Sequence, residues 1–503
     1  MRVVGLFEQS TSTIILPDNT RCTTADITQS GCQLAARFQA AGYLPGDRVA
    51  VCLPNGRLYL ELLVATSIAR LVLVSVNTRY SPTEADDLVT RSGARLLINN
   101  ANVLADAIPQ IEIGAVNDQA KAAAASSSEM ANPEDPFLIF TTSGTTSKPK
   151  MVLHKQRSIA VHGGHAAAAF SYNEQDTALL VMPFCGTFGM SSLTAALAAN
   201  CTIVVTDHFE AQATGALLKE HGVTVLNGSD DMFHRLVEAG IDISGVRLGG
   251  YARFNSSLDG IVERTEQAGA HISGLYGMSE VQALFSLRDP KGNATSRAKA
   301  GGTLVSPEAS YRIVDGELQL RGPSMFAGYL AEGGSEIDAV LTAKNFDDGW
   351  FKTGDAADSE TDSTFTYHTR IGDVLRLGGF LVSPADIEAV LLEVSAVHEA
   401  QVVTVDLPTG TRPVAFVVAD EHFNEEATIA HCRERMARYK VPIRVIPLDT
   451  FPVTPSANGN KIQVVKLREL AASTIKKAEQ GVQTEQTEQT EQHQPAEQEA
   501  SVS

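Results

Sequence analysis

In the stretch Phe140-Thr-Thr-Ser-Gly-Thr-Thr-Ser-Lys-Pro-Lys150, a predicted buried strand leads directly into a loop that can hold an anion. The apolar run Pro136-Phe-Leu-Ile-Phe140 predicts that strand. The segment after it is rich in hydroxyls, contains one glycine and two lysines, and is too polar for a core. Such a loop can wrap an anion, since glycine lets the backbone approach closely, N–H groups and hydroxyls donate, and lysine supplies charge.

The same loop has two other interpretations, a Walker-type phosphate loop and a polar surface turn. The Walker-type spacing, Gly-x4-Gly-Lys-Ser/Thr, is absent, so the loop is not that kind of phosphate loop. Taken alone, a cluster of hydroxyl residues is more typical of a polar surface turn. The anion-binding interpretation gains its weight from stretches further along the chain.

Length and charge limit the class of protein. A chain of 503 residues is too long for one core, so two or more domains are expected. The formal net charge of -19 argues against nucleic acid or an anionic membrane as the main partner. No apolar stretch is long enough to span a membrane, and the first residues do not have the pattern of a signal peptide.

The cysteines and histidines do not form an evident metal site. The six cysteines are scattered without a Cys-x-x-Cys pair, which is typical of free thiols in a reducing cytoplasm. His162-Gly-Gly-His165 has no third ligand nearby in the sequence, so we interpret both histidines as ordinary ones.

The first two thirds of the chain alternate strand-like and helix-like segments. Arg48–Leu53 and Leu71–Val76 are predicted strands, with a helix over Tyr59–Ala69 between them. Ser81-Pro-Thr-Glu84 has the serine cap, early proline and third-position glutamate of a helix start. This alternation predicts a parallel α/β sheet. Further strands are expected at Thr177–Met182, Thr202–Val205, Val223–Leu226 and Val246–Gly249.

Antiparallel signals begin after Gly302. Tyr311–Leu320 contains two strand-like runs around Asp315-Gly316, a strong hairpin signal, and Thr364–His368 is a further strand. Past a boundary near Arg370-Ile-Gly-Asp373, the sequence predicts a compact α+β unit. Its expected elements are a helix opening at Ser383-Pro384, strands at Val402–Val405 and Val414–Val418, and a helix over Glu425–Tyr439.

These segments predict an α/β protein with two domains and a tail. Residues 1–371 form a large domain with parallel α/β subdomains and a small β-barrel-like part, and residues 372–470 form a small, mobile α+β domain. Residues 471–503 include a Thr-Glu-Gln repeat without apolar residues, so we expect a disordered acidic tail.

Four more stretches belong with the hydroxyl-rich loop. Each combines glycines with a few polar or charged residues: Gly274-Leu-Tyr-Gly-Met-Ser-Glu280, Gly349-Trp-Phe-Lys-Thr-Gly-Asp355, Thr369-Arg-Ile-Gly-Asp-Val-Leu-Arg-Leu-Gly-Gly379 and Pro455-Ser-Ala-Asn-Gly-Asn-Lys461. In this order and spacing they resemble the adenylate-forming (AMP-binding) superfamily, in its acyl-CoA synthetase branch. The resemblance covers roughly residues 20 to 470.

The resemblance implies a reaction and its cofactors. A substrate carboxylate attacks the α-phosphorus of ATP, pyrophosphate leaves, and the acyl-adenylate then reacts with the thiol of CoA. The attacking carboxylate is already ionised, so catalysis consists of positioning and of stabilising charge on phosphate oxygens. Mg²⁺ is the expected metal.

The resemblance also assigns roles to individual residues. Those expected at the β- and γ-phosphates are Thr142, Ser143, Gly144, Thr145, Thr146 and Lys150. Tyr276 and Gly277 are expected at the nucleotide, with the tyrosine flanking adenine. Ser279 is expected at the α-phosphate, and Glu280 as the Mg²⁺ ligand.

Three further positions come from the later stretches. Asp355 is expected to bind the ribose hydroxyls, and Arg370 the ribose or a phosphate. Lys461 is expected to bridge the carboxylate and the α-phosphate, so that the catalytic residues are Lys461, Glu280 and Thr142. Gly379 belongs to the glycine turn at which the pantetheine arm of CoA enters.

The chain departs from the family pattern at several positions. Ser147 and Met151 stand where glycine is usual, and Gly186 replaces a common histidine. Gly372 stands at the family's hinge, where glycine suits a pivot. Asp230 and Asp231 are polar in a segment that usually lines the acyl site. Either they cap the helix predicted over Met232–Glu238, or one of them meets a polar group of the acid.

We therefore expect an ATP-dependent carboxylic acid–CoA ligase located in the cytoplasm. The alternatives are a stand-alone ligase that loads an acyl or peptidyl carrier protein, and a catalytically silent binding protein that retained the fold. The presence of Glu280, Asp355 and Lys461 argues against the silent protein.

Overall fold

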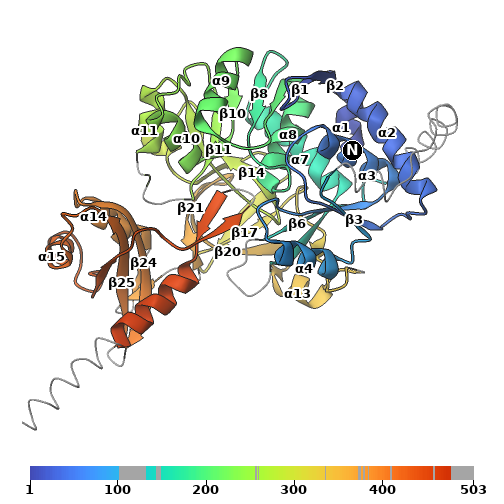
Figure 1. Cartoon of the computed structure of the whole chain (residues 1–503). Coiled ribbons are helices and arrows are strands. Elements are labelled where there is room, and N and C mark those ends of the chain that lie inside the picture. Colours follow the sequence, from blue (N-terminus) through green and yellow to red (C-terminus); the bar gives the residue numbers. More distant parts are fainter. Residues whose placement is uncertain are drawn as a thin grey trace, which may run out of the picture. The chain divides into compact units, whose positions relative to one another are not determined.

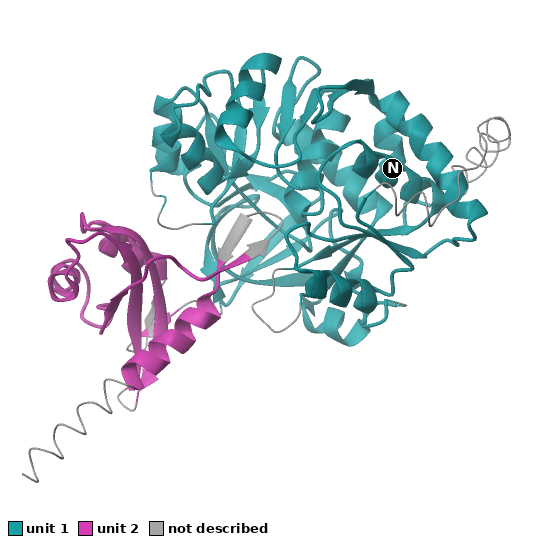
Figure 2. Cartoon of the chain, in the orientation of Figure 1, with its two compact units in different colours: residues 1–372, 455–461 teal, residues 373–454, 462–503 magenta. Residues whose placement is uncertain are grey.

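The computed structural model describes residues 1–100, 132–142, 149–254, 258, 260–334, 336–371, 375–377, 380–382, 384–407, 410–456 and 459–476. The chain divides into two compact units, one of residues 1–372 with 455–461 and one of residues 373–454 with 462–503 (Figure 2). Within the described residues, no helix has the length and apolarity needed to cross a bilayer.

A six-stranded sheet carries the hydroxyl-rich loop. Its order is β18-β7-β6-β4-β3-β5. The strands are β3 (Arg48–Val51), β4 (Val72–Ser75), β5 (Leu96–Ile98), β6 (Pro136–Thr141), β7 (Met151–Lys155) and β18 (Gly328–Tyr329). β3, β4, β5 and β6 are parallel, which confirms the predicted parallel sheet. β7 runs antiparallel to β6, so the loop joins two neighbouring strands.

Local chemistry explains the helices beside this sheet (Figure 1). In α4 (Pro82–Ser92), the Ser81 side chain accepts from the Glu84 N–H, and the Glu84 carboxylate accepts from the Ser81 N–H, so the predicted cap is confirmed. α3 (Arg57–Ala69) buries nearly every residue from Tyr59 onward, which explains its almost continuous apolar sequence. α2 (Thr24–Ala40) packs against it.

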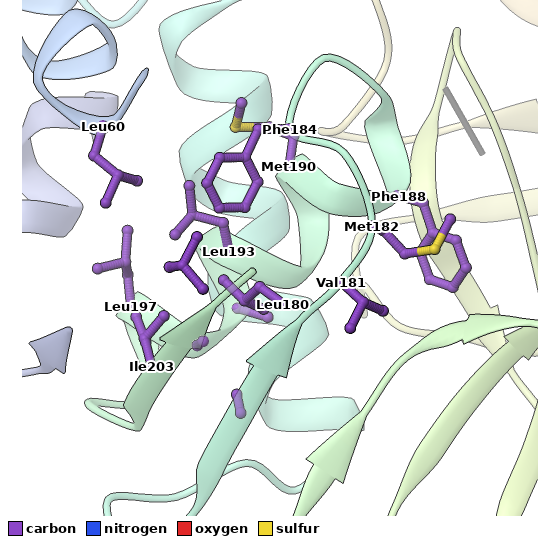
Figure 3. Close-up of a cluster of buried hydrophobic side chains, with 14 of the residues drawn as sticks. Leu60, Leu180, Val181, Met182, Phe184, Phe188, Met190, Leu193, Leu197 and Ile203 are labelled. Atoms are coloured by element: carbon purple, nitrogen blue, oxygen red, sulfur yellow. The ribbon is translucent and has the colours of Figure 1, made fainter. Parts of the chain in front are cut away.

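A second, five-stranded sheet has the order β10-β8-β9-β1-β2. Its strands are β1 (Thr13–Ile15), β2 (Arg21–Thr23), β8 (Thr177–Leu180), β9 (Thr202–Val205) and β10 (Val225–Leu226). Figure 3 shows the core beside it, in which Leu193 and Leu197 of α8 (Thr187–Ala198) lie near Leu180 and Ile203. All four side chains are at least 96% buried, so this packing holds the helix on the sheet.

The largest sheet carries Tyr276, Gly277, Asp355 and Arg370, and Ser279 and Glu280 directly follow one of its strands. Its main order is β11-β12-β13-β14-β15-β21-β20-β17-β16, and β19 (Phe346–Asp347) pairs with β20. The strands are β11 (Gly228–Ser229), β12 (Gly249–Ala252), β13 (Ile272–Met278), β14 (Gln282–Leu287), β15 (Gly301–Leu304), β16 (Ser310–Val314), β17 (Glu317–Arg321), β20 (Trp350–Thr361) and β21 (Thr364–Arg370).

Two expectations for this sheet had different outcomes. The hairpin is confirmed, since β16 and β17 pair around Asp315 and Gly316, whose φ values of 51° and 80° suit the tight turn. The strand predicted over Val246–Gly249 was placed three residues too early along the chain, because β12 begins only at Gly249. Val246 is nevertheless buried, so apolar character alone did not mark the strand.

The second unit is built on a three-stranded sheet of β24 (Val397–Leu407), β25 (Gly410–Ala419) and β26 (Val445–Pro447). α14 (Pro384–Leu392) packs on β24, and α15 (Glu425–Arg435) packs on α14 and β26. α15 ends four residues before the predicted Tyr439.

The predicted start of the tail at residue 471 was too early. The chain is helical over 464–476, and Leu467 and Ala471 are fully buried against apolar residues of β24 and β25. Burial of these two residues therefore extends the folded part past the point where polar sequence begins. Residues 477–503, with the Thr-Glu-Gln repeat, lie outside the described residues.

Candidate functional site

Thr142 and Lys150 close the neck of the hydroxyl-rich loop. The Thr142 N–H donates to the Lys150 carbonyl at 3.0 Å, and the Lys150 N–H donates to Thr142 Oγ1 at 3.1 Å. These two bonds continue the pairing of β6 and β7 by one step. The predicted phosphate-binding residues between them, Ser143, Gly144, Thr145 and Thr146, lie outside the described residues.

Arg91, a residue that the sequence analysis missed, holds the base of this loop. Its guanidinium Nη2 donates to the Pro149 carbonyl at 2.9 Å, next to Lys150. The same side chain pairs with Asp87 at 2.9 Å and Glu332 at 3.2 Å and is only 8% exposed. Because it is at the C-terminal end of α4, Arg91 ties the loop to a helix distant in sequence.

Tyr276, Asp355 and Arg370 form one hydrogen-bonded cluster. Asp355 on β20 faces Arg370 on β21, and Arg370 Nη1 donates to Asp355 Oδ1 at 2.5 Å. The Tyr276 hydroxyl, from β13, donates to Asp355 Oδ2 at 2.6 Å. Burial and the neighbouring Asp355 carboxylate raise the pKa of Tyr276 well above its usual value, so the phenol keeps its proton.

Close packing surrounds the ring of Tyr276 and the backbone of Gly277. Tyr276 packs edge-on against Phe365 at 5.3 Å between ring centroids and lies 5.7 Å from Tyr367. A Cβ at Gly277 would come within 2.5 Å of Ala283 Cα, so only glycine lets β13 and β14 approach this closely.

Glu280 lies in the turn after β13 and is 4% exposed. Its Oε1 accepts from the Tyr329 hydroxyl at 2.8 Å, and Lys150 Nζ sits 4.6 Å from the centroid of the same tyrosine ring. Burial raises the pKa of Glu280, while the positive charges of Arg370 and Lys150 lower it. Tyr276 of the Tyr276–Asp355–Arg370 cluster lies only four residues before Glu280, and Tyr329 contacts both Glu280 and Lys150, so the loop neck and the cluster belong to one site.

Ser279 is held mainly by a second residue missed from sequence, His154 on β7. His154 is fully buried, and its Nε2 lies 2.7 Å from the Ser279 carbonyl. The Gln282 amide nitrogen, which can only donate, lies 2.9 Å from His154 Nδ1. His154 Nδ1 therefore accepts, and Nε2–H donates to Ser279.

Burial lowers the pKa of His154 to about 4, which keeps this histidine neutral near pH 7. The only signal in the sequence was a polar residue inside an otherwise apolar strand, Met151-Val-Leu-His-Lys155. The Ser279 hydroxyl itself reaches the Thr141 carbonyl at 3.5 Å, so the turn lies beside the loop.

Several predicted site positions lie outside the described residues. They are Gly372, Gly379 and the Lys461 side chain, although the Lys461 backbone belongs to β28 (Gly459–Ile462). Among the described residues there is no group of three or more His, Cys, Asp or Glu side chains able to hold a metal. A Mg²⁺ ion at Glu280 would suit a nucleotide site, because this ion is usually held by one or two carboxylates together with waters and substrate phosphates.

His162, Asp230 and Asp231 take part in packing and backbone hydrogen bonding. His162 Nε2 lies 2.5 Å from the Ala283 carbonyl inside the core. The helix predicted from Met232 is α10 (Asp230–Glu238), and its N-cap is Ser229, so the idea that the aspartates cap it was wrong in detail. Asp230 is fully buried and accepts from the N–H groups of Asp231 and Phe254, each at 2.9 Å.

A model of the family described as AMP-binding enzyme matches residues 7–330, and one of the AMP-binding enzyme C-terminal domain matches residues 386–458. The chain belongs to the AMP-binding enzyme family. The resemblance drawn from the motifs is therefore confirmed.

Relatives in the AMP-binding enzyme family align over most of the chain. A (7a-methyl-1,5-dioxo-octahydro-1H-inden-4-yl)propanoyl:CoA ligase of Mycobacterium tuberculosis is 29% identical, covering 91% of this chain and 96% of its own. A 2-succinylbenzoate–CoA ligase of Bacillus licheniformis is 28% identical, covering 86% and 91%. The structure of ATP-bound MatB from Rhodopseudomonas palustris has a TM-score of 0.77 at 22% identity, covering 93% of this chain and 99% of MatB. This likeness confirms the predicted α/β fold class.

Proposed function

We propose that this AMP-binding enzyme is an ATP-dependent carboxylic acid–CoA ligase. The observation that carries the proposal is geometric: Tyr329 contacts both Glu280 and Lys150, and Tyr276, four residues before Glu280, donates to Asp355. The relatives that align over 91% and 86% of the chain are named CoA ligases, which supports the same assignment.

The reaction follows from the chemistry of the substrates. In the first step a carboxylate oxygen attacks the α-phosphorus of ATP, an O–P bond forms, and the bond to pyrophosphate breaks. In the second step the CoA sulfur attacks the carbonyl carbon, AMP leaves, and the thiol proton goes to solvent. Neither step needs a strong base, because the acid is already ionised and AMP is a good leaving group.

The described residues have chemistry that suits the nucleotide. In this proposal Lys150 and the hydroxyl-rich loop, with Thr142 at its neck, bind the β- and γ-phosphates. Tyr276 and Gly277 flank the adenine, and Ser279 meets the α-phosphate. Asp355 binds the ribose hydroxyls, and Arg370, whose side chain is 50% exposed, reaches the ribose or a phosphate.

Mg²⁺ fits Glu280, because a carboxylate oxygen is the hard ligand that this ion prefers. When bound with ATP, the ion would offset negative charge on the phosphates during attack. Glu280 would hold it from the protein side, and Lys461 would supply positive charge between the carboxylate and the α-phosphate.

We also propose that residues 372–470 move between the two steps, with Gly372 as the pivot and the turn at Gly379 admitting CoA. The large domain, residues 1–371, would hold ATP and the acid. A cytoplasmic location is part of the proposal, and the six free cysteines are compatible with a reducing compartment.

The test is pyrophosphate release with a panel of carboxylic acids, followed by addition of either CoA or a carrier protein. A ligase releases pyrophosphate with at least one acid, and thioester formed with CoA but not with carrier protein identifies the acceptor. Release with no acid contradicts the proposal, and transfer only to carrier protein favours the alternative ligase.

Lys461→Ala provides an internal check of the two steps. It should abolish pyrophosphate release yet still convert supplied acyl-adenylate to thioester, because in this proposal the lysine acts only in the first step, before the small domain moves, and AMP is a good leaving group without it. Lys466→Ala, at an exposed position of the helix 464–476, is the matched control and should retain both steps. Equal loss of both steps in Lys461→Ala would contradict the assigned role.

A further inference from the structure

We propose that Tyr329 is a positioning residue that orients two groups at once, the Glu280 carboxylate through its hydroxyl and the Lys150 ammonium through its ring. The inference rests on the proposed function, because it assigns these two groups to Mg²⁺ and to the phosphates of ATP. Tyr329 itself touches neither substrate in this proposal.

The geometry at the hydroxyl is that of a strong hydrogen bond. Tyr329 Oη lies 2.8 Å from Glu280 Oε1, and the two residues are 1% and 4% exposed. A phenol has one proton to donate, and here it goes to a carboxylate oxygen shielded from water. The bond therefore restricts rotation of the carboxylate that would receive the metal.

The aromatic ring of Tyr329 contacts the ammonium group of Lys150. Lys150 Nζ lies 4.6 Å from the ring centroid of Tyr329, within the range in which an ammonium is attracted to an aromatic face. Lysine is a point charge on a flexible four-carbon stem, so an aromatic support reduces the number of positions that it samples. The ring thus keeps the ammonium beside the loop neck.

The backbone of Tyr329 is fixed independently of its side chain. β18 pairs with β7, and the Ala327 N–H and Leu330 N–H donate to the Leu153 and Met151 carbonyls at 2.7 and 2.8 Å. The Tyr329 N–H donates to Thr342 Oγ1 at 3.0 Å. A change of side chain should therefore leave the strand in place.

A purely structural role is the competing explanation, since the Tyr329 ring also packs edge-on against Phe326 at 4.9 Å. Two variants separate the explanations. Tyr329→Phe removes only the hydroxyl and keeps the ring near Lys150 and Phe326. Tyr329→Leu removes both the hydroxyl and the aromatic face.

The experiment measures ATP binding by calorimetry, once with excess Mg²⁺ and once with EDTA, together with the melting temperature. For Tyr329→Phe we expect the Kd of MgATP to rise about tenfold, while the Kd of metal-free ATP changes less than twofold. For Tyr329→Leu we expect both Kd values to rise several-fold, because the support of Lys150 is lost as well.

Tyr59→Phe is the matched control. Tyr59, in α3, is equally buried at 1% exposure, and its hydroxyl lies 3.2 Å from the Ser75 hydroxyl. It should leave both Kd values unchanged. The inference is overturned if Tyr329→Phe leaves MgATP binding unchanged, or weakens binding equally with and without Mg²⁺, as a structural role predicts. It is also overturned if the wild-type chain binds no ATP.

The binding measurement keeps the two proposals distinguishable. A chain that shows these Kd changes but releases no pyrophosphate with any acid would sustain the role of Tyr329 and contradict the ligase. If the wild-type chain releases pyrophosphate but Tyr329→Phe binds MgATP normally, the ligase is supported and the role of Tyr329 is contradicted.

Discussion

Asp355 and Arg370 face each other across β20 and β21, and the arginine donates to one carboxylate oxygen at 2.5 Å. The other oxygen accepts from Tyr276 at 2.6 Å. A carboxylate held on both oxygens is oriented before any ligand arrives. This preorganisation suits the proposed binding of Asp355 to the two ribose hydroxyls.

Asp355→Ala should weaken ATP binding by about 10- to 100-fold, because a hydrogen bond to a charged group contributes about 1.5–3 kcal/mol. Calorimetric titration with ATP measures the change. Asp358→Ala is the matched control, since Asp358 is on the same strand with a side chain that is 79% exposed and pairs with His368. Unchanged affinity in Asp355→Ala would remove the aspartate from the nucleotide site.

Glu280→Gln should retain the fold and reduce pyrophosphate release by about a hundredfold or more, because a neutral amide is a poorer Mg²⁺ ligand and the metal supplies several kcal/mol of charge stabilisation. Rapid-quench measurement of pyrophosphate over a range of Mg²⁺ concentrations would show the loss. Glu308→Gln, at an exposed position, serves as the control. A wild-type rate in Glu280→Gln is the result that contradicts the metal assignment.

Asp230→Ala should lower the free energy of unfolding by about 1–3 kcal/mol, since two backbone N–H groups lose a buried acceptor. Asp231→Ala, at an exposed position, should change it by less than about 0.5 kcal/mol. Urea unfolding measures both, and the acid panel should rank acids as in the wild type. A changed ranking with unchanged stability would instead mean that Asp230 meets the acid.

Stability should fall as the pH is lowered below about 6.5, through two buried histidines. Burial lowers the pKa of His154 and of His162 from 6.5 to about 4, so between these values the unfolded chain binds more protons than the folded one. Each histidine then costs on the order of 3 kcal/mol of stability once the pH reaches about 4.

The measurement is urea unfolding from pH 7.5 to 4.5, followed by the fluorescence of the only tryptophan, Trp350. His154→Gln should flatten the pH dependence while its amide still donates to Ser279. His271→Gln, at an exposed position, should not. An identical pH dependence in His154→Gln and the wild type would contradict the buried neutral state.

Local sequence determined those elements whose stabilising groups are neighbours along the chain. The cap of α4 lies within Ser81–Glu84, and the β16–β17 turn within Asp315-Gly316, so both were predictable. The loop between Thr142 and Lys150 follows from a buried strand running into polar residues. The residue types of the site, and the family, were readable for the same reason.

Tertiary structure alone decided which residues meet. Tyr329 is 49 positions from Glu280, and His154 is 125 positions from Ser279, so no local pattern pairs them. The helix 464–476 passes the predicted boundary because Leu467 and Ala471 are buried against β24 and β25, although the sequence there is turning polar. Burial and long-range pairing depend on which surfaces the folded chain brings together, and a sequence read segment by segment does not contain that information.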